Sequence, residues 1–73
     1  MNRSQQLLQI FREVLETNDI DETVSQANCE AWDSIHHLNL ILAIESGFNI
    51  SLEPEEMERM QDFATALKIV EGK

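Results

Sequence analysis

The feature that most constrains this chain is the mostly apolar run from Ile35 to Ile44, which directly follows Asp33 and Ser34. Asp and Ser both favour the start of a helix, because their side chains accept hydrogen bonds from backbone N–H groups that lack a partner inside the helix. The apolar residues of the run lie around most of the helix circumference rather than on one stripe. We therefore predict a helix over about residues 34 to 45 or 46, the most buried of the chain, with Gly47 at its C-cap.

Three further helices are predicted from spacing and capping signals. Apolar residues recur at helical intervals near the start, which predicts a helix over about residues 4–16 with Ser4 as its N-cap. Pro54 suits the first position of a short helix that ends near Met60, and Asp62 is placed to cap a last one. The apolar residues of the first and last helices are Leu7, Leu8, Ile10, Phe11, Val14 and Leu15, and then Phe63, Ala66, Leu67, Ile69 and Val70.

Two segments show no helical pattern. Residues 17–33 form a predicted long loop, and loops of this length in so small a domain tend to be functional or disordered. Residues 48–52 alternate apolar and polar but have no second strand to pair with, so we predict an extended segment held against the core. The predicted inward-facing anchors of the long loop are Ile20, Val24, Ala27 and Trp32.

From these segments together we expect an all-α bundle of three main helices and one short one, as a single domain over residues 1–73.

The size and the net charge of the chain limit the classes of function and partner that we expect. A single core of 73 residues contributes only about 3–5 kcal/mol of net stability, which leaves little room for an enclosed active site. Fourteen acidic side chains against five basic ones give a net charge of −9, so we expect basic protein surfaces as partners and no nucleic acid. Cys29 is alone, and the sequence shows no signal peptide or membrane span, which favours a cytoplasmic location.

The stretch Trp32-Asp33-Ser34-Ile35 resembles the Asp-Ser-Leu motif of acyl carrier proteins and related peptidyl carriers. The resemblance extends through Leu38 and residues 40–45, 48–50 and 54–56, and it covers essentially the whole chain. It implies an acyl-carrier-like bundle in which a separate transferase, using coenzyme A and Mg²⁺, esterifies Ser34 with 4′-phosphopantetheine. By the same resemblance, Asp33 is a supporting carboxylate that helps to ligate the metal of the transferase.

The resemblance further implies a free-standing, monomeric carrier that is not an enzyme. It would hold acyl groups as thioesters on the arm and present them to partner enzymes whose basic patches meet its acidic face in salt-sensitive contacts. Family members of fatty acid synthesis usually carry acidic residues where this chain has His36, His37 and Asn39, which favours a specialised lipid, polyketide or related pathway. The residues expected to contact partners are Ile35, Glu45, Glu53, Glu55 and Glu56.

Other interpretations remain open at this point. The cargo could be an amino acid, as in aminoacyl, D-alanyl or peptidyl carriers, or the chain could be a purely protein-binding helical module. The long loop also places oxygen-bearing side chains at the spacing of an EF-hand calcium loop, although Val24 stands where that loop requires glycine. The side chains at that spacing are Asp19, Asp21, Thr23, Ser25 and Glu30.

Several residues have both a chemical and a packing explanation. Ser34 could be only a helix cap. Ser34 and His37 are three apart on one helix, but no third group orients the histidine and no oxyanion hole is evident, so we expect no catalytic or zinc site and solvent-facing histidines. Trp32 is predicted to anchor the long loop. The residues that either line a cleft for an acyl chain or simply pack in the core are Ile41, Ile44, Leu52, Met57 and Met60.

Overall fold

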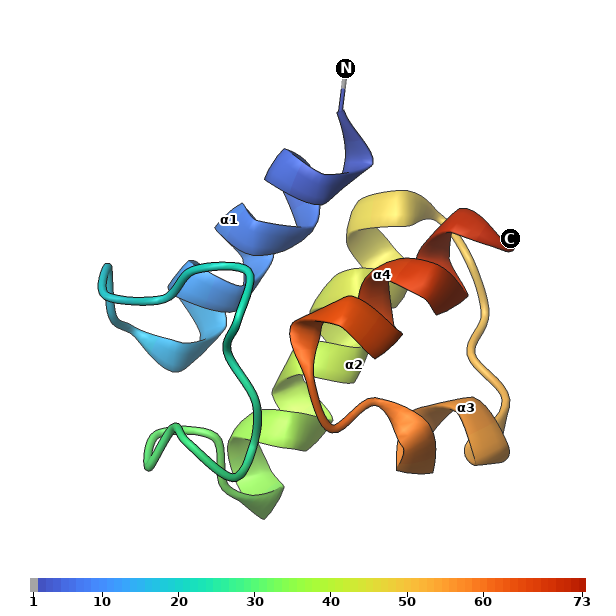
Figure 1. The fold of residues 1–73 in the computed structure, drawn as a ribbon. Helices are drawn as coiled ribbons and strands as arrows, with labels where there is room; N and C mark the ends of the chain where they lie inside the picture. Colours follow the sequence, from blue (N-terminus) through green and yellow to red (C-terminus); the bar gives the residue numbers. More distant parts are fainter. Residues whose placement is uncertain (1) are drawn as a thin grey trace.

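The computed structural model describes residues 2–73 and forms four α-helices in that part of the chain (Figure 1). They are α1 (Arg3–Leu15), α2 (Ser34–Phe48), α3 (Pro54–Arg59) and α4 (Phe63–Glu71). No strand is found within these residues, apart from one isolated antiparallel bridge between Ser25 and Asp62. The predicted all-α bundle of three main helices and one short one is confirmed. No helix of the described chain is both long and apolar enough to cross a membrane.

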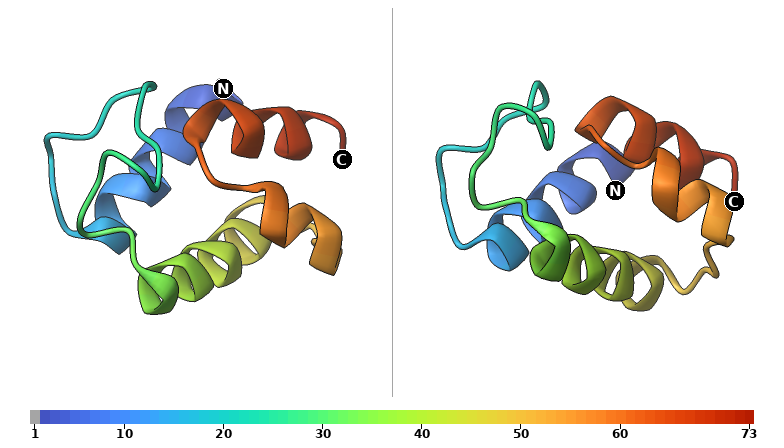
Figure 2. Two further views of the ribbon diagram at one scale, coloured as in Figure 1. Left: turned by 60° about the horizontal axis from the view of Figure 1, so that its bottom comes forward. Right: turned by 90° about the horizontal axis from the view of Figure 1, so that it is seen from below.

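The helices enclose one hydrophobic core. α1 packs against α2 and α4, and the short α3 packs against α4. Both views of Figure 2 show α2 along one side of the molecule, with α1 and α4 facing it. At the centre, Phe11 meets Trp32 and Phe63 edge to face, with ring centroids 5.2 and 5.4 Å apart. The buried core residues are Leu7, Phe11, Leu15, Ile20, Val24, Trp32, Leu40, Ile41, Ile44, Leu52, Met60, Phe63, Ala66 and Val70.

The long loop is held by three of its four predicted anchors. Ile20, Val24 and Trp32 are buried, whereas Ala27 is exposed, so that prediction is wrong. Ala27 lies in a tight turn closed by Asn28, whose backbone N–H donates to Ser25 O and whose Oδ1 accepts from Ser25 N–H. This turn points residue 27 into solvent.

Backbone hydrogen bonds join the long loop to the start of α4. Gln26 N–H donates to Gln61 O at 2.8 Å, and Phe63 N–H donates to Val24 O at 3.0 Å. These bonds satisfy backbone groups that would otherwise lie unpaired beside the core, which is costly for a buried segment. The loop is therefore ordered although it has no helix of its own.

Two predicted caps are wrong. α1 begins one residue earlier than expected, because Asn2 rather than Ser4 is its N-cap and accepts a hydrogen bond from Ser4 N–H at 2.8 Å. α2 continues through Gly47 to Phe48, and its C-cap is Asn49, in the left-handed conformation with φ 55°. Gly47 instead permits close approach to α1, since a Cβ there would lie 2.9 Å from Cδ1 of Ile10.

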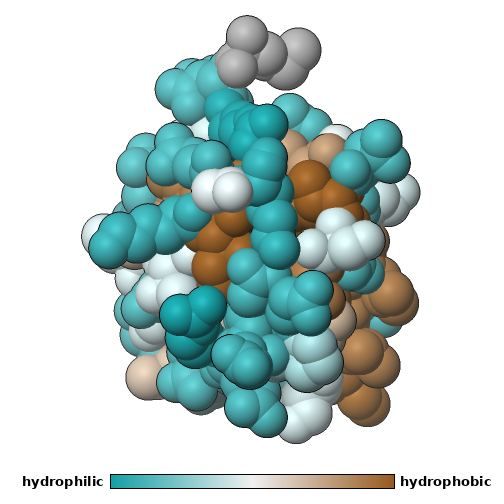
Figure 3. All heavy atoms as spheres, turned by 90° about the vertical axis from the view of Figure 1, so that its right-hand side faces the viewer, coloured by the Kyte–Doolittle hydropathy of each residue, from teal (hydrophilic) through white to brown (hydrophobic). Residues whose placement is uncertain are grey.

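The expectation that α2 is the most buried helix is also wrong. Ile35, Leu38 and Leu42 are 71, 59 and 57% exposed. A domain of this size has too few elements to cover a helix on all sides, and small domains bury a smaller fraction of their surface than large ones. Figure 3 shows the outcome on one face of the molecule, where hydrophobic side chains reach the surface beside hydrophilic ones.

The end of α1 stores backbone strain that one substitution should release. Its C-cap, Glu16, has φ 55° and ψ 39°, a left-handed conformation that costs a residue with a Cβ about 1–2 kcal/mol. Glu16→Gly should raise the free energy of unfolding in urea by about 1 kcal/mol, since the greater chain entropy of glycine offsets part of the gain. Asn49→Gly should gain less, because asparagine tolerates this conformation.

Glu16→Ala is the matched control, because it removes the carboxylate and keeps the Cβ. A gain from Glu16→Ala equal to that from Glu16→Gly would assign the effect to charge and contradict the strain.

Candidate functional site

Ser34 is the first residue of α2 and is exposed. The N-cap is the preceding residue, Asp33, whose Oδ1 accepts a hydrogen bond from His36 N–H at 2.9 Å. Asp33 therefore fills the capping role that Ser34 could have had. Within residues 2–73, no hydrogen bond engages the Ser34 hydroxyl, so this oxygen is free at the positive end of a 15-residue helix.

Asp33 brings a negative charge next to this hydroxyl. The hydrogen bond from the backbone N–H of His36, followed by the contact with the His36 side chain, lowers the pKa of Asp33. His36 Nδ1 lies 2.9 Å from Asp33 Oδ1. Since the carboxyl group is exposed and its pKa is depressed, Asp33 is ionised at neutral pH and open to a cation carried by another molecule.

This depressed pKa predicts a pH-dependent contribution to stability. A carboxylate whose pKa is lower in the folded state stabilises the fold above the unfolded pKa, and that stabilisation is lost as the pH falls through the folded pKa. Asp33→Asn keeps a good helix cap but cannot titrate. Wild type should therefore lose more unfolding free energy than Asp33→Asn when the pH falls from about 6 to about 3, as measured by urea unfolding.

The other carboxylates are present in both wild type and Asp33→Asn, so their contribution to the pH dependence cancels in the difference between the two proteins. Parallel pH profiles for wild type and Asp33→Asn would contradict the assigned cause.

His37 is tied into the structure and does not face solvent, contrary to the prediction. Trp32 Nε1–H donates to His37 Nδ1 at 2.9 Å, so the ring proton lies on Nε2, which donates to Met57 O at 3.0 Å. The two rings are also stacked, with centroids 5.9 Å apart. His37 thus links the loop, α2 and α3, and both its nitrogens are engaged elsewhere than at Ser34. A buried tryptophan N–H needs an acceptor, and this was the signal in the sequence for such a contact.

The predicted partner-contacting residues fall into two groups. Ile35, Glu53 and Glu55 are exposed. Glu45 is half-buried and accepts a hydrogen bond from Leu52 N–H at 2.8 Å. Glu56 is also half-buried: it accepts from Glu53 N–H and pairs with Lys73 at 2.7 Å, and these contacts, the Glu53 bond first, lower its pKa.

The structure therefore brings Asp33, Ser34 and Ile35 together at the start of α2. It places Glu45 near the other end of that helix and the remaining carboxylates at the start of α3. Two of the four predicted contact carboxylates, Glu45 and Glu56, are already engaged within the molecule.

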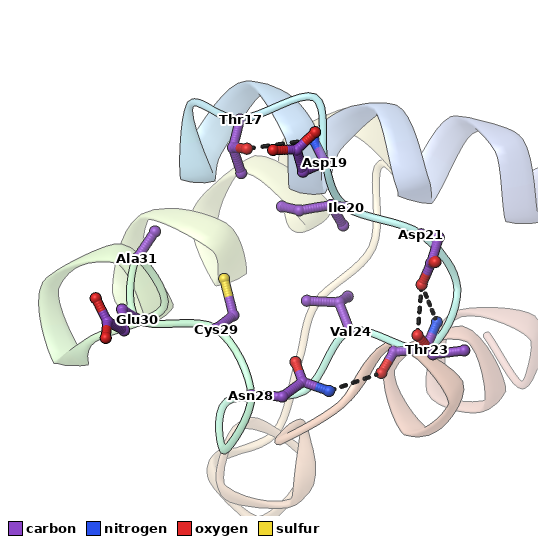
Figure 4. A pocket seen from close by; sticks show the side chains of 10 residues that line it. All are labelled: Thr17, Asp19, Ile20, Asp21, Thr23, Val24, Asn28, Cys29, Glu30 and Ala31. Atoms are coloured by element: carbon purple, nitrogen blue, oxygen red, sulfur yellow. Dashed lines mark hydrogen bonds between the residues drawn. The ribbon is translucent and has the colours of Figure 1, made fainter.

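The residues at EF-hand spacing do not gather around one point. Figure 4 shows Asp19, Asp21 and Glu30 on separate parts of the rim of an open cavity of about 420 Å³. Asp21 accepts hydrogen bonds from the backbone and hydroxyl of Thr23, which lower its pKa. Among the described residues, no group of three or more His, Cys, Asp or Glu side chains could hold a metal ion.

The five residues predicted either to line a cleft for an acyl chain or to pack in the core are part of the hydrophobic core. Ile41, Ile44, Leu52 and Met60 are buried in the central cluster, and Met57 packs against it, half-buried. Trp32 is 2% exposed, which confirms that it is a packing anchor.

Comparison with known proteins adds a whole-length structural match. No protein-family model matches the sequence, and no curated protein matches it. The solution NMR structure of a holo acyl carrier protein from Geobacter metallireducens is similar to this structure, with a TM-score of 0.87 and 28% sequence identity. The match covers 100% of this chain and 86% of that chain. The chain therefore has the fold of an acyl carrier protein and resembles that family over its whole length.

Proposed function

We propose that this protein carries acyl groups as thioesters on a 4′-phosphopantetheine arm attached through Ser34. The observation that carries this proposal is the division of roles at the start of α2. Asp33 caps the helix, which leaves the Ser34 hydroxyl exposed and without a hydrogen-bond partner among the described residues. A residue that served only as a cap would have its oxygen engaged. The whole of residues 1–73 is then one carrier domain.

The position of Ser34 suits a phosphodiester. The N-terminal end of a helix carries partial positive charge and unpaired N–H groups, and both favour a bound phosphate. α2 has 15 residues, so its dipole is well developed at Ser34. The residues present therefore fit the cofactor that the family resemblance implies.

The attachment reaction needs little from the carrier itself. Ser34 Oγ attacks the phosphorus of coenzyme A that bears the pantetheine group, the bond from this phosphorus to the bridging diphosphate oxygen breaks, and adenosine bisphosphate leaves. The hydroxyl proton passes to a base of the transferase. The ionised Asp33 beside Ser34 is placed to ligate the Mg²⁺ of that transferase. Once attached, the arm supplies a terminal thiol for thioester formation.

We further propose a specialised lipid, polyketide or related pathway, and this rests on the residues around Ser34. His36, His37 and Asn39 stand near the serine where a more acidic face is usual in carriers of fatty acid synthesis, and the exposed carboxylates Glu53 and Glu55 lie instead at the start of α3. Partner enzymes with basic patches would meet that acidic end.

The proposal is tested by intact-mass measurement. The purified chain is incubated with coenzyme A, Mg²⁺ and a broad-specificity phosphopantetheinyl transferase. We expect the mass to rise by one phosphopantetheine group, located on Ser34 by fragmentation. Ser4, Ser25, Ser46 and Ser51 serve as internal controls. No gain in mass, or a gain at one of these four serines, would overturn the assignment.

A further inference from the structure

Positive charge gathers at one place in this acidic chain. A cavity of about 320 Å³ is formed by α3, α4 and the residues that follow α4, and Arg59, Lys68 and Lys73 line it. These are three of the five basic side chains of a protein with a net charge of −9. The other residues that line the cavity are Glu56, Thr65, Ile69 and Gly72.

Two of the three cations are free to bind a ligand. Lys73 pairs with Glu56 at 2.7 Å. Within residues 2–73, no hydrogen bond or ion pair engages the side chain of Arg59 or Lys68. The pKa of Glu56 is lowered first by its bond from Glu53 N–H and also by the charge of Arg59, so Arg59 lies close to the same carboxylate. Three cations and one carboxylate leave the side chains of the cavity with a net charge of +2.

The helix dipoles explain part of this arrangement. Arg59 lies in the last turn of α3 and Lys68 in the last turn of α4, where a cation is favourable next to the carbonyl end of a helix. That effect accounts for each cation separately. It does not require that the two side chains converge on one cavity together with Lys73, or that both stay unpaired there.

The size and the charge of the cavity favour one class of ligand. Ligand pockets in proteins measure about 300–1,000 Å³, so a cavity of about 320 Å³ suits a small molecule. A phosphate monoester carries a charge of about −1.5 to −2 at pH 7 and matches the side-chain charge of +2, whereas a single carboxylate does not. A guanidinium group can bind two phosphate oxygens at once, and a lysine adds a point charge.

We propose that this cavity binds a small phosphate monoester, with Arg59 and Lys68 on the phosphate oxygens and the half-buried Ile69 against the apolar part of the ligand. The site is separate from Ser34, because Figure 1 shows α3 and the end of α4 at the right of the molecule and the start of α2 at the bottom. The inference is independent of the proposed function.

An acidic segment of a partner protein suits the cavity less well. The same two helices carry the exposed carboxylates Glu55, Glu58 and Glu71, none of which lines the cavity. An extended acidic chain would pass these groups and be repelled, and the net charge of −9 adds to the repulsion. A small ligand touches only the cationic lining.

The first experiment is an NMR titration of the whole chain with phenyl phosphate, at pH 7.5 and low salt. The backbone amide signals should shift in a saturable way, most strongly at residues 59, 65, 68, 69, 72 and 73, and little at Ser34. Acetate should bind at least about threefold more weakly, because it brings one charge instead of two. Inorganic phosphate lacks the apolar part and should also bind more weakly than phenyl phosphate.

Variants test the assigned residues. Replacing both Arg59 and Lys68 by Gln should raise the dissociation constant for phenyl phosphate at least about fivefold. Both residues are exposed, so circular dichroism should show an unchanged fold. The matched control combines Gln5→Glu and Asn18→Asp, which make the same change in net charge at exposed positions outside the cavity. It should stay within about twofold of wild type, because charges farther away than about 10 Å are screened.

Glu56→Gln changes the affinity in the opposite direction. It removes the one carboxylate of the cavity and keeps an oxygen that can accept from Glu53 N–H. Phenyl phosphate should then bind at least about threefold more tightly, since Lys73 is released and the repulsion is gone.

Three results would overturn the inference. They are the absence of saturable shifts at the cavity, equal binding of acetate and phenyl phosphate, and equal weakening by the control pair and by the Arg59 and Lys68 variant. A phosphoserine peptide that binds at least about tenfold more tightly than phenyl phosphate would replace the small molecule by a protein partner and also overturn it. Failure of Ser34 to be loaded would overturn the proposed function alone, because none of these measurements uses the transferase.

Discussion

Ser34→Ala is expected to abolish loading with phosphopantetheine while leaving the fold intact. The substitution removes the one hydroxyl that we place at the attachment point, and no other side-chain hydroxyl of α2 lies at the start of the helix beside Asp33. Stability should change little, because Asp33 caps α2 and the Ser34 hydroxyl makes no hydrogen bond within residues 2–73. Intact mass after incubation with coenzyme A, Mg²⁺ and transferase gives the first result, and urea unfolding gives the second.

Ser46→Ala is the matched control, since Ser46 is also exposed on α2 but lies three turns from the start of the helix. It should be loaded at the wild-type rate. Gain of the arm by Ser34→Ala would show that the cofactor is attached elsewhere. Loss of loading in both variants would point to a general defect of the helix rather than to the loss of one hydroxyl.

Trp32→Ala is expected to unfold the protein under ordinary conditions. Trp32 is 2% exposed, packs edge-on to Phe11, stacks on His37 and donates the hydrogen bond to His37 Nδ1. Truncating a buried tryptophan to alanine costs about 3–5 kcal/mol. That equals the roughly 3–5 kcal/mol of net stability that a domain of this size has in total. A circular dichroism spectrum without helical signal at 25 °C would be the direct result.

Trp32→Phe separates the ring from its N–H. It keeps most of the buried surface and loses the hydrogen bond to His37, so it should stay folded and be less stable by about 1 kcal/mol. Trp32 is the single tryptophan of the chain, so unfolding has to be followed by circular dichroism rather than by indole fluorescence. A folded Trp32→Ala protein with wild-type stability would show that the loop does not depend on this anchor.

The functional site depends on this anchor because of its place in the sequence. Trp32 directly precedes Asp33 and Ser34, and its contact with His37 fixes the first turn of α2 relative to the loop. Through Met57 O, the same histidine holds α3 against that turn. The stability of the core and the position of the Ser34 hydroxyl are therefore coupled, and partial loss of the anchor should lower the loading rate before the fold is lost.

Local signals in the sequence were sufficient for the helices and for the candidate residue. Helical spacing of apolar residues, Pro54 at the start of α3 and Asp62 at the start of α4 predicted elements that the structure contains. These signals act within one or two turns, so they can be read without knowing what lies across the core. The motif around Ser34 is equally local, and the resemblance that it indicated is to the same family as the similar solved structure.

Tertiary contacts decided three features that local patterns in the sequence did not predict correctly. The run 35–44 has apolar residues around most of the helix circumference. Its residues Ile35, Leu38 and Leu42 are nevertheless exposed to solvent, because no other element of this small fold covers them. From the sequence, Gly47 was predicted to end the helix, but in the structure it allows the side chain of Ile10 to pack closely against α2. His37 reads as a surface residue but joins Trp32 to α3.

The sequence by itself determined where the helices form and which serine stands at the start of α2, since hydrophobic periodicity and capping are properties of neighbouring residues. Only the tertiary structure decided which side of α2 is buried, that its one carboxylate is turned to an internal hydrogen bond, and that its exposed large side chains are apolar. These features depend on which elements meet across the core, and such contacts join residues far apart in the chain.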